Sequence, residues 1–380
     1  MQRRDFLKLM PAVAATSVAG VHALLSPRAQ AGINATQLPQ LPWRGADLSF
    51  LPQMESAGAI YRRNGVPQDC IQLLRAQGCN QVRLRLWVNP VEGWCNLQRT
   101  IQMARRAKLA GLNVLLDIHY SDTWADPGQQ TKPATWTSLN FPSLTQQVRT
   151  YTRDVLIAMG SAGALPNAVQ LGNEITDGML WPSGRISNTT QGGWTNFTTL
   201  LSAARQGVDD ACSPSRRPKV VIHIDRGADF AASSWFFDNL ASRNVRWDVT
   251  ALSYYPWWHG SLEQCRATVH GLATRYNKPV FIAETAYPWT LGWNDNTNNL
   301  VGLPQQLLAG FPATPAGQAS YLRSLCAIMH ETPNNLGLGI NWWAPDWIST
   351  PLGSAWENLA WFDFAGNVLP AAAAIATPAN

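Results

Sequence analysis

Short runs of apolar residues alternate along the chain with longer segments in which apolar residues recur every three or four positions. The short runs have the length of buried strands, and the longer segments have the periodicity of amphipathic helices. The pattern predicts eight strands, at residues 44–48, 82–88, 112–118, 168–171, 220–224, 249–253, 280–283 and 337–343. Helices are predicted between them, including residues 97–110, 144–159, 197–208 and 261–276.

This alternation is typical of parallel sheets, and eight repeats favour an α/β fold in which a single (β/α)8 TIM barrel carries long loops that form a substrate cleft. The alternative is an open, doubly wound sheet. Such sheets commonly carry a G-x-G-x-x-G turn after the first strand, and this sequence has none there. Residues 32–380 contain no long Ser/Gly linker and no repeat, so we expect them to form one catalytic barrel domain.

The first 31 residues have a different character from the rest. Residues 3–8 (RRDFLK) precede a mildly apolar run and then Ala-Gln-Ala, a sequence of the kind that signal peptidase cleaves after. The paired arginines resemble the bacterial twin-arginine signal, so residues 1–31 are predicted to be a cleaved signal peptide of an exported, periplasmic or extracellular protein. An N-terminal amphipathic helix, the alternative, would explain neither feature. After cleavage no membrane attachment is expected, because no later segment has about 18 consecutive apolar residues.

The composition excludes several classes of protein. The chain has 380 residues, of which 46% are hydrophobic and 14% charged, as in a globular protein. The net charge of +5 lies mostly in the first 31 residues, so no basic stripe remains for a nucleic-acid partner. The six cysteines show no zinc-ligand spacing, and both disulfides and buried free thiols remain open. A barrel of this size needs no partner to fold, so a monomer is expected.

Polar and aromatic residues follow the predicted strands, and in a barrel these strand ends share one face. Glu174 follows the fourth strand and Glu284 follows the seventh. Hydrolysis of a glycosidic bond with retention needs two such carboxyl groups about 5–5.5 Å apart, one as acid and one as nucleophile. A single Glu at a strand end is more often a structural hydrogen bonder, but both together on these strands favour a catalytic pair.

The acid must stay protonated while the nucleophile is ionised, so neighbouring groups must separate their pKa values. Arg85, at the end of the second strand, is predicted to hold Glu284 in its charged form, with Arg83 on the same side of the strand as the second choice. Tyr254 or Tyr255 is predicted to donate a hydrogen bond to Glu284.

The 18 Trp residues are the other strong signal, and many lie in predicted loops. Indole faces stack on the C–H faces of pyranose rings while polar side chains meet the hydroxyl groups, although core packing is the alternative for any single Trp. Asn173, beside Glu174, is placed to meet a sugar 2-hydroxyl. The predicted substrate-binding residues are Arg85, His119, Asp122, Trp124, Asn173, His223, Asp225, Tyr254, Tyr255, Trp343 and Trp347.

A set of motifs spans nearly the whole chain after the signal. They are residues 44–49 (RGADLS), 82–90 (VRLRLWVNP), 116–130 (LDIHYSDTWADPGQQ), 171–175 (LGNEI), 253–256 (SYYP), 283–285 (AET) and 343–347 (WAPDW). In these motifs the sequence resembles the arabinogalactan endo-β-1,4-galactanases of glycoside hydrolase family 53. The resemblance implies that Glu174 is the acid/base, that Glu284 is the nucleophile, and that the substrate is β-1,4-galactan of pectic side chains, cut internally. The residue chemistry alone indicates only a β-glycan.

Some bacterial members of that family hold calcium after the seventh and eighth strands. Here the Asn-rich segment, residues 294–299 (NDNTNN), offers oxygen ligands but no well-matched set. We expect no metal and no required cofactor, with calcium as the alternative. Two other functions remain open: a retaining endo-glycanase acting on mannan or cellulose, and a non-catalytic glycan-binding protein, which would not need two facing carboxylates.

Overall fold

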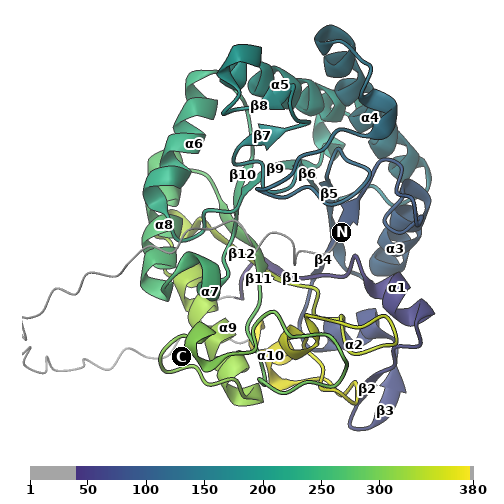
Figure 1. Cartoon of the computed structure of the whole chain (residues 1–380), viewed down its shortest axis with the longest axis vertical. Coiled ribbons are helices and arrows are strands. Elements are labelled where there is room, and N and C mark those ends of the chain that lie inside the picture. Colours follow the sequence, from purple (N-terminus) through teal and green to yellow (C-terminus); the bar gives the residue numbers. More distant parts are fainter. Residues whose placement is uncertain (1–39, 377–380) are drawn as a thin grey trace, which may run out of the picture. The chain divides into compact units, whose positions relative to one another are not determined.

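The computed structural model describes residues 40–376, and its helices surround a central set of strands (Figure 1). The predicted signal peptide lies outside the described residues. Eight parallel strands close into a barrel, and each strand pairs with the barrel strands that precede and follow it in the chain. The barrel strands are β1 (Trp43–Asp47), β4 (Gln81–Leu86), β5 (Asn113–Ile118), β6 (Ala168–Leu171), β9 (Lys219–Ile224), β10 (Val249–Ser253), β11 (Val280–Thr285) and β12 (Gly337–Trp343).

The predicted closed barrel is confirmed, and all eight predicted strands are present with ends that agree to within two residues. The helices are α1 (Leu51–Ser56), α2 (Cys70–Ala76), α3 (Leu97–Leu109), α4 (Phe141–Ser161), α5 (Gly193–Ala211), α6 (Phe230–Ser242), α7 (Pro256–His259), α8 (Leu262–Tyr276), α9 (Pro315–His330) and α10 (Pro370–Ala374). The four helices predicted by range correspond to α3, α4, α5 and α8.

The loops carry smaller elements. Two hairpins follow β1 and β6, namely β2 (Tyr61–Arg63) with β3 (Val66–Gln68) and β7 (Gly178–Met179) with β8 (Gly184–Arg185). Short 3₁₀ helices span Ala134–Trp136, Thr189–Gln191, Pro214–Arg216, Pro304–Gln306, Pro333–Asn335 and Glu357–Leu359. Within residues 40–376, no helix combines the length and the apolar character needed to cross a membrane.

Capping side chains set where several of the outer helices begin. Asp69 accepts a hydrogen bond from the backbone N–H of Gln72 at the start of α2, and Asn96 accepts one from Arg99 at the start of α3. Ser261 and Gln264 form a reciprocal capping box at α8. Each cap satisfies a backbone N–H that the helix cannot, which is worth about 1 kcal/mol.

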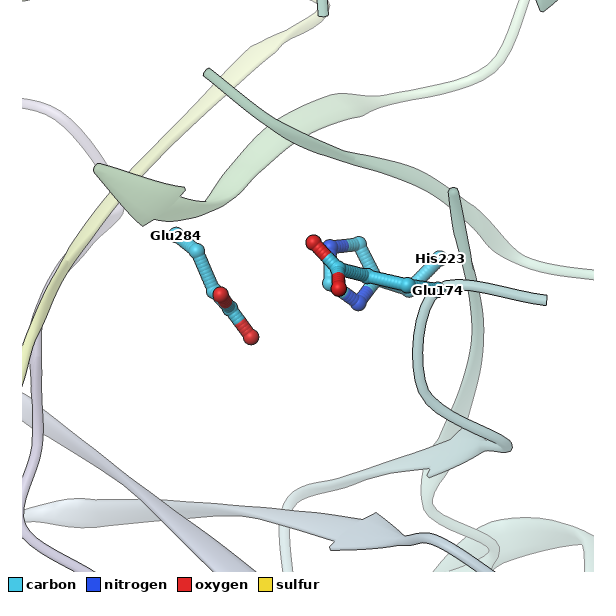
Figure 2. Close-up of side chains that lie close together, drawn as sticks. All are labelled: Glu174, His223 and Glu284. Atoms are coloured by element: carbon cyan, nitrogen blue, oxygen red, sulfur yellow. The ribbon is translucent and has the colours of Figure 1, made fainter. Parts of the chain in front are cut away.

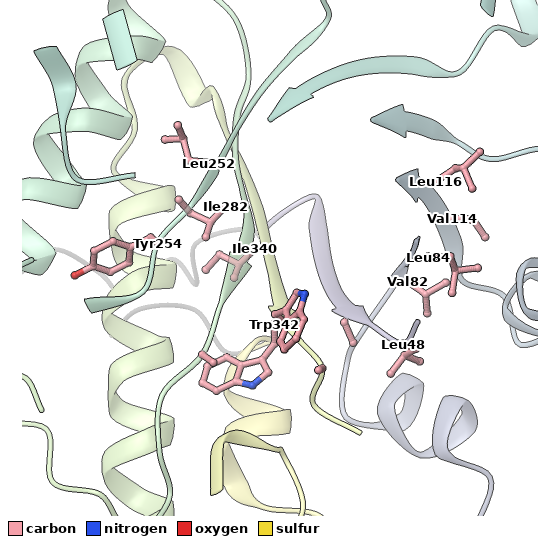
Figure 3. Close-up of a cluster of buried hydrophobic side chains, with 14 of the residues drawn as sticks. Leu48, Val82, Leu84, Val114, Leu116, Leu252, Tyr254, Ile282, Ile340 and Trp342 are labelled. Carbon is pink, nitrogen blue, oxygen red and sulfur yellow. The ribbon is translucent and has the colours of Figure 1, made fainter. Parts of the chain in front are cut away.

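Two hydrophobic clusters fill the barrel and its outer layer. The larger packs the outward faces of the strands against the helices, through residues such as Val82, Leu84, Ile282 and Ile340 (Figure 3). The smaller lies on the opposite faces of the strands and is made of Leu115, Ala168, Val221, Val249, Ala251, Phe281 and Ala283. Because side chains alternate along a strand, Asp117, Gln170, His223 and Ser253, two positions beyond members of this second cluster, also point inward, and they are polar.

All six cysteines lie in the described part of the chain, and none forms a disulfide. Five are buried, and Cys212 is partly exposed. Of the two interpretations left open by the sequence, the structure supports free thiols.

Candidate active site

Glu174 and Glu284 meet at the carboxyl ends of the strands. Glu284 comes from one side, and Glu174 and His223 come from the other (Figure 2). One side-chain ligand atom from each of these three residues lies within 4.8 Å of those of the other two. Only 4% of Glu174 and 1% of Glu284 is exposed. Oxygens this close fit the carboxyl separation of about 5–5.5 Å in retaining glycosidases better than the separation of about 6.5–9.5 Å in inverting ones.

An irregularity in β11 turns Glu284 into the barrel. Phe281 and Ala283 both belong to the inner cluster, so simple alternation would direct the next residue outward. The register between β10 and β11 shifts here, with Leu252 opposite Ile282 and Ser253 opposite Glu284. The extra residue in β11 re-aims the side chain, as β-bulges near active sites commonly do.

Arg83, on β4, forms the centre of a buried charged layer. Its Nη1 lies 2.7 Å from Asp47 Oδ2 and 3.0 Å from Glu284 Oε1, and its Nη2 lies 2.8 Å from Asp117 Oδ2. Nη2 also donates to Asn173 Oδ1 at 2.8 Å. One guanidinium therefore ties together residues from β1, β4, β5 and β11 and the residue before Glu174.

The prediction that Arg85 holds Glu284 is wrong, and the second choice, Arg83, takes this role. Arg85 lies two residues further along β4, where its guanidinium packs over the rings of Trp124 at 4.0 Å and Phe50 at 4.7 Å. Its Nη2 donates to Cys95 Sγ at 3.4 Å. The two arginines lie on the same face of β4 but at different depths in the barrel, so Arg83 contacts carboxylates and Arg85 contacts aromatic rings.

The charges in this layer shift one another's protonation. Burial alone would raise the pKa of Asp117, but Arg83 and His119 outweigh it and lower the pKa to about 2. For Arg83, burial lowers the pKa, and the three carboxylates of Asp117, Glu284 and Asp47 raise it above its ordinary range. Arg83 and Asp117 are therefore both charged at neutral pH, and Glu284 lies beside a permanent positive charge.

Of the two tyrosines predicted to contact Glu284, Tyr255 does so. Its hydroxyl donates to Glu284 Oε2 at 2.9 Å, so Arg83 and Tyr255 hold the two oxygens of this carboxylate separately. Tyr254 points into the outer hydrophobic cluster and donates to the carbonyl oxygen of Gly260 at 2.9 Å. Its predicted contact with substrate is therefore corrected, because its side chain lies on the far side of the strand.

Glu174 is held through its backbone as well as its side chain. Its φ of +46° is in the left-handed region, which costs a non-glycine residue about 1 kcal/mol or more. The side-chain amide of Gln130 donates to the carbonyl of Asn173 at 2.8 Å, and the backbone N–H of Ile175 donates to the carbonyl of His223 at 3.0 Å. Ser253 Oγ donates to Glu174 Oε1 at 2.7 Å. Together these contacts hold Glu174 in its strained backbone conformation.

Two of the predicted polar residues, His119 and Asn173, are fixed next to the catalytic pair by hydrogen bonds to their neighbours. The backbone N–H of Ala125 donates to His119 Nδ1 at 3.0 Å, so Nε2 carries the ring proton and donates it to Asp117 at 3.0 Å. Asn173 accepts from Arg83 through Oδ1 and donates through Nδ2 to the carbonyl of Ala125 at 2.8 Å. Both side chains are buried and lie next to the catalytic pair, where they fix its surroundings.

The other predicted polar residues lie in different places. His223 is fully buried next to Glu174, with Nε2 2.9 Å from Ser253 Oγ. Asp122 accepts the backbone N–H groups of Asn89 and Ala134, so it joins two loops. Asp225 accepts the hydroxyl proton of a Thr in the loop after β6, and burial raises its pKa.

The predicted aromatic residues Trp124, Trp343 and Trp347 gather around Phe50. Trp347 stacks on Phe50 with ring centroids 4.1 Å apart, and the Phe50–Trp343 and Trp124–Trp343 centroid distances are 5.7 and 6.2 Å. Because these rings pack largely on one another, only part of their surface can meet a ligand. The ring centroids of Trp258 and Tyr255 lie 5.3 Å apart. Trp258 is 42% exposed, so its indole offers more surface to a ligand than the rings around Phe50 do.

Sequence reasoning missed Asp117, Gln130, Gln170 and Ser253. Asp117 and Gln170 lie two residues after the inward-facing Leu115 and Ala168 on β5 and β6, so strand alternation could have found them. Ser253 ends β10 and directly precedes the predicted tyrosines. A small hydroxyl residue at a strand end gives no signal of its own.

The acidic side chains at the Asn-rich segment already accept hydrogen bonds from the protein. Both carboxylate oxygens of Asp295 accept backbone N–H groups, from Thr297 and Ser354. Glu357, which faces the segment, accepts the backbone N–H of Asn294 at 2.7 Å through one oxygen and a serine hydroxyl proton through the other. Protein donors thus tie both carboxylates into the loops, and a calcium ion would have to share these oxygens with them or displace them.

An eight-stranded parallel barrel with two buried carboxylates at this separation, one from the loop after β6 and one from β11, is the arrangement of a retaining glycoside hydrolase. The family model described as "Glycosyl hydrolase family 53" matches residues 43–375. The chain belongs to this family.

Relatives and solved structures agree with this assignment. Over 341 residues the chain is 43% identical to a protein of the bgaB 5′ region of Niallia circulans, covering 87% of this chain and 92% of that protein. Over 339 residues it is 37% identical to an arabinogalactan endo-β-1,4-galactanase of Cellvibrio japonicus, covering 86% of this chain and 88% of that enzyme. The structure of the Ignisphaera aggregans GH53 catalytic domain matches with a TM-score of 0.83 and 38% identity, covering 90% of this chain and 98% of that one.

Proposed function

We propose that this glycoside hydrolase is an endo-acting β-1,4-galactanase that cleaves galactan, the side chain of type I arabinogalactan in pectin, with retention. The observation that carries the reaction type is the buried Glu174–Glu284 pair, whose oxygens lie within 4.8 Å. The substrate rests on the curated relatives of comparable length, which include the Cellvibrio japonicus arabinogalactan endo-β-1,4-galactanase.

In the first step, Glu284 attacks the anomeric carbon while Glu174 gives its proton to the glycosidic oxygen, so that a covalent galactosyl-enzyme forms and the leaving chain departs as an alcohol. Arg83 and Tyr255, which contact separate oxygens of Glu284, stabilise the negative charge of the nucleophile and fix its orientation. As the ester forms, negative charge leaves Glu284, and the remaining carboxylates of the layer still balance Arg83.

In the second step, Glu174, now a carboxylate, takes a proton from water, and the resulting nucleophile displaces Glu284 from the anomeric carbon. The two inversions return the β configuration. Asn173 has a second amide proton beyond the one donated to Ala125, and we assign it to the sugar 2-hydroxyl. That contact strengthens in the transition state.

The stacking surface for the sugar rings is assigned to the indoles near the catalytic pair. Trp258 is the most open of these, and Trp124, Trp343 and Trp347 supply edges of the cluster around Phe50. Arg85 stabilises that cluster through a cation–π contact with the ring of Trp124. His119, Asp122, His223 and Asp225 act indirectly, by holding loops and catalytic side chains in place.

The test is a pair of variants, Glu284→Ala and Glu174→Ala, assayed with azide. Glu284→Ala is expected to lose activity by about 10⁴-fold or more and, with azide and an activated aryl β-galactobioside, to form the inverted α-galactosyl azide. Glu174→Ala is expected to form the β-galactosyl azide through the intact nucleophile. Arg83 keeps Asp47 and Asp117 in Glu284→Ala, so the fold should survive. Wild-type activity in either variant would refute that assignment.

The substrate is tested by time-resolved NMR of products from purified β-1,4-galactan, with mannan and carboxymethyl cellulose alongside. Release of β-anomeric galacto-oligosaccharides from galactan alone is the expected result. Inactivity on galactan with cleavage of another β-glycan would favour the alternative endo-glycanase.

We further propose that the enzyme is exported through the twin-arginine-type signal in residues 1–31, acts as a monomer in the periplasm or outside the cell, and needs no metal or other cofactor. Buried free thiols suit a protein that folds before export, because they are enclosed when it reaches an oxidising compartment.

A further inference from the structure

Ser253 lies between the proposed acid/base and a buried histidine. Its Oγ is 2.7 Å from Glu174 Oε1 and 2.9 Å from His223 Nε2. Ser253 and His223 are both fully buried. The three side chains, from the loop after β6 and from β9 and β10, form one continuous chain of hydrogen bonds.

The hydroxyl of a serine has a single proton, so the direction of this chain depends on His223. His223 Nδ1 lies 3.2 Å from the side-chain amide nitrogen of Gln170, which can donate to it, and 3.1 Å from Asn173 Oδ1, which already accepts from Arg83 at 2.8 Å. With Gln170 as the donor to Nδ1, the ring proton is on Nε2, which donates to Ser253 Oγ. Ser253 is left to donate its own proton to Glu174, and it cannot turn away without losing both bonds.

The backbone places Ser253 at this point. The β10–β11 register shifts between Leu252 and Ser253, so Ser253 lies opposite Glu284. The carbonyl of Ser253 accepts the backbone N–H of Gly227 at 3.1 Å, where a Cβ on Gly227 would lie 2.4 Å from that oxygen. The serine is therefore fixed at the depth of the catalytic pair.

We propose that Ser253, oriented by His223, is a positioning residue for the acid step: its hydrogen bond to Oε1 fixes the orientation in which the carboxyl group of Glu174 delivers its proton to the leaving group. This inference rests on the proposed role of Glu174. Gln130 fixes the strained backbone at Glu174, and Ser253 supplies the matching restraint on its carboxyl group. A carboxyl group free to rotate would present its proton in a productive orientation for a smaller part of the time.

The test uses substrates that differ in their need for an acid. Cleavage of galactan expels an alkoxide and needs protonation, whereas a 2,4-dinitrophenyl β-galactobioside expels a stable phenolate and does not. The ratio kcat/KM reports only the steps up to glycosyl-enzyme formation, so the later base step does not enter. We expect Ser253→Ala to lose about 10- to 100-fold in kcat/KM on galactan and less than about 3-fold on the dinitrophenyl substrate.

The matched control is Ser233→Ala. Ser233 is another fully buried serine, on α6, which donates to the carbonyl of Arg226 at 2.8 Å. It should leave both kcat/KM values unchanged. Circular dichroism and the melting temperature of each variant establish that it is folded.

Glu174→Ala distinguishes a failure of the proposed role of Ser253 from a failure of the acid/base assignment of Glu174. If Glu174→Ala shows the leaving-group dependence and Ser253→Ala loses both substrates equally or neither, the role of Ser253 is refuted and the proposed function stands. If Glu174→Ala itself shows no leaving-group dependence, the assignment of the acid/base fails, and the inference about Ser253 fails with it.

Discussion

Replacing Arg83 with methionine tests the charged layer beneath the catalytic pair. The side chain of Arg83 is 2% exposed, and its guanidinium lies within 3.0 Å of carboxylate oxygens of Asp47, Asp117 and Glu284. Methionine fills a similar volume, so the substitution removes the charge and the donors while making little cavity. The three carboxylates then remain buried without their common counter-ion.

Breaking a buried ion pair by removing one partner costs about 3–5 kcal/mol, and here three partners lose it together. We therefore expect Arg83→Met to lower the free energy of unfolding at pH 7 by at least about 3 kcal/mol. The control is Arg106→Met. Arg106 also pairs with two carboxylates, of Glu55 and Asp69, but its side chain is 33% exposed, so the loss should stay near 1 kcal/mol or below.

The dependence on pH is diagnostic. In the wild type the pKa of Asp117 is lowered to about 2, so this carboxylate contributes stability that is complete above about pH 4 and lost as the pH falls toward 2. Without Arg83, burial becomes the dominant influence, and the folded variant takes up protons more readily than the unfolded chain. The variant should gain stability as the pH falls from 7 toward 4, and the difference from wild type should narrow.

Urea unfolding followed by fluorescence at pH 7, 5.5 and 4.5 measures both effects. An Arg83→Met deficit no larger than that of Arg106→Met, or one that does not narrow at low pH, would refute the electrostatic account of the layer.

Three further outcomes follow from the site. Tyr255→Phe removes a donor to a catalytic carboxylate and should lower kcat/KM about 10-fold or more, whereas Tyr254→Phe, whose hydroxyl lies outside the site, should change it little; equal effects in initial-rate assays would contradict the placement. Trp258→Ala should raise KM for galactan about 3- to 10-fold, whereas Trp235→Ala, on α6 and 53% exposed, should not, and a rise in both would argue against a local stacking surface. Incubation with EDTA should alter neither activity nor melting temperature, because Asp295 already accepts protein donors; a loss restored by calcium would overturn this.

Most of the barrel could be predicted from the sequence because strand length and helix period repeat regularly along the chain. The identity of the Glu284 partner could not. Arg83 and Arg85 occupy the same face of β4, and about 6.6 Å of rise along the strand separates a residue in the charged layer from one among aromatic rings. The alternation of residues predicts which face of β4 points inward. The depth at which the catalytic pair lies along that face depends on how the strands are staggered in the closed barrel.

The two tyrosines show what alternation decides once the inward face of a strand is known. Val249, Ala251 and Ser253 lie on the inward face of β10, and the same alternation directs Tyr255 into the site and Tyr254 away from it. Ser253 was missed for a different reason. Its importance comes from a position between Glu174 and His223 that exists only after three separate elements have come together.

The charged layer and the aromatic residues belong to different parts of the architecture. Arg83, Asp117 and Glu284 all stand on barrel strands, whereas Trp258 and the rings around Phe50 mostly follow the strands in their loops. Apart from Glu174 and Tyr255, which directly follow their strands, bond cleavage and polymer recognition are thus built on separable parts of the chain. A designer who keeps these two residues could exchange the loops beyond them to accept a differently branched or decorated polysaccharide.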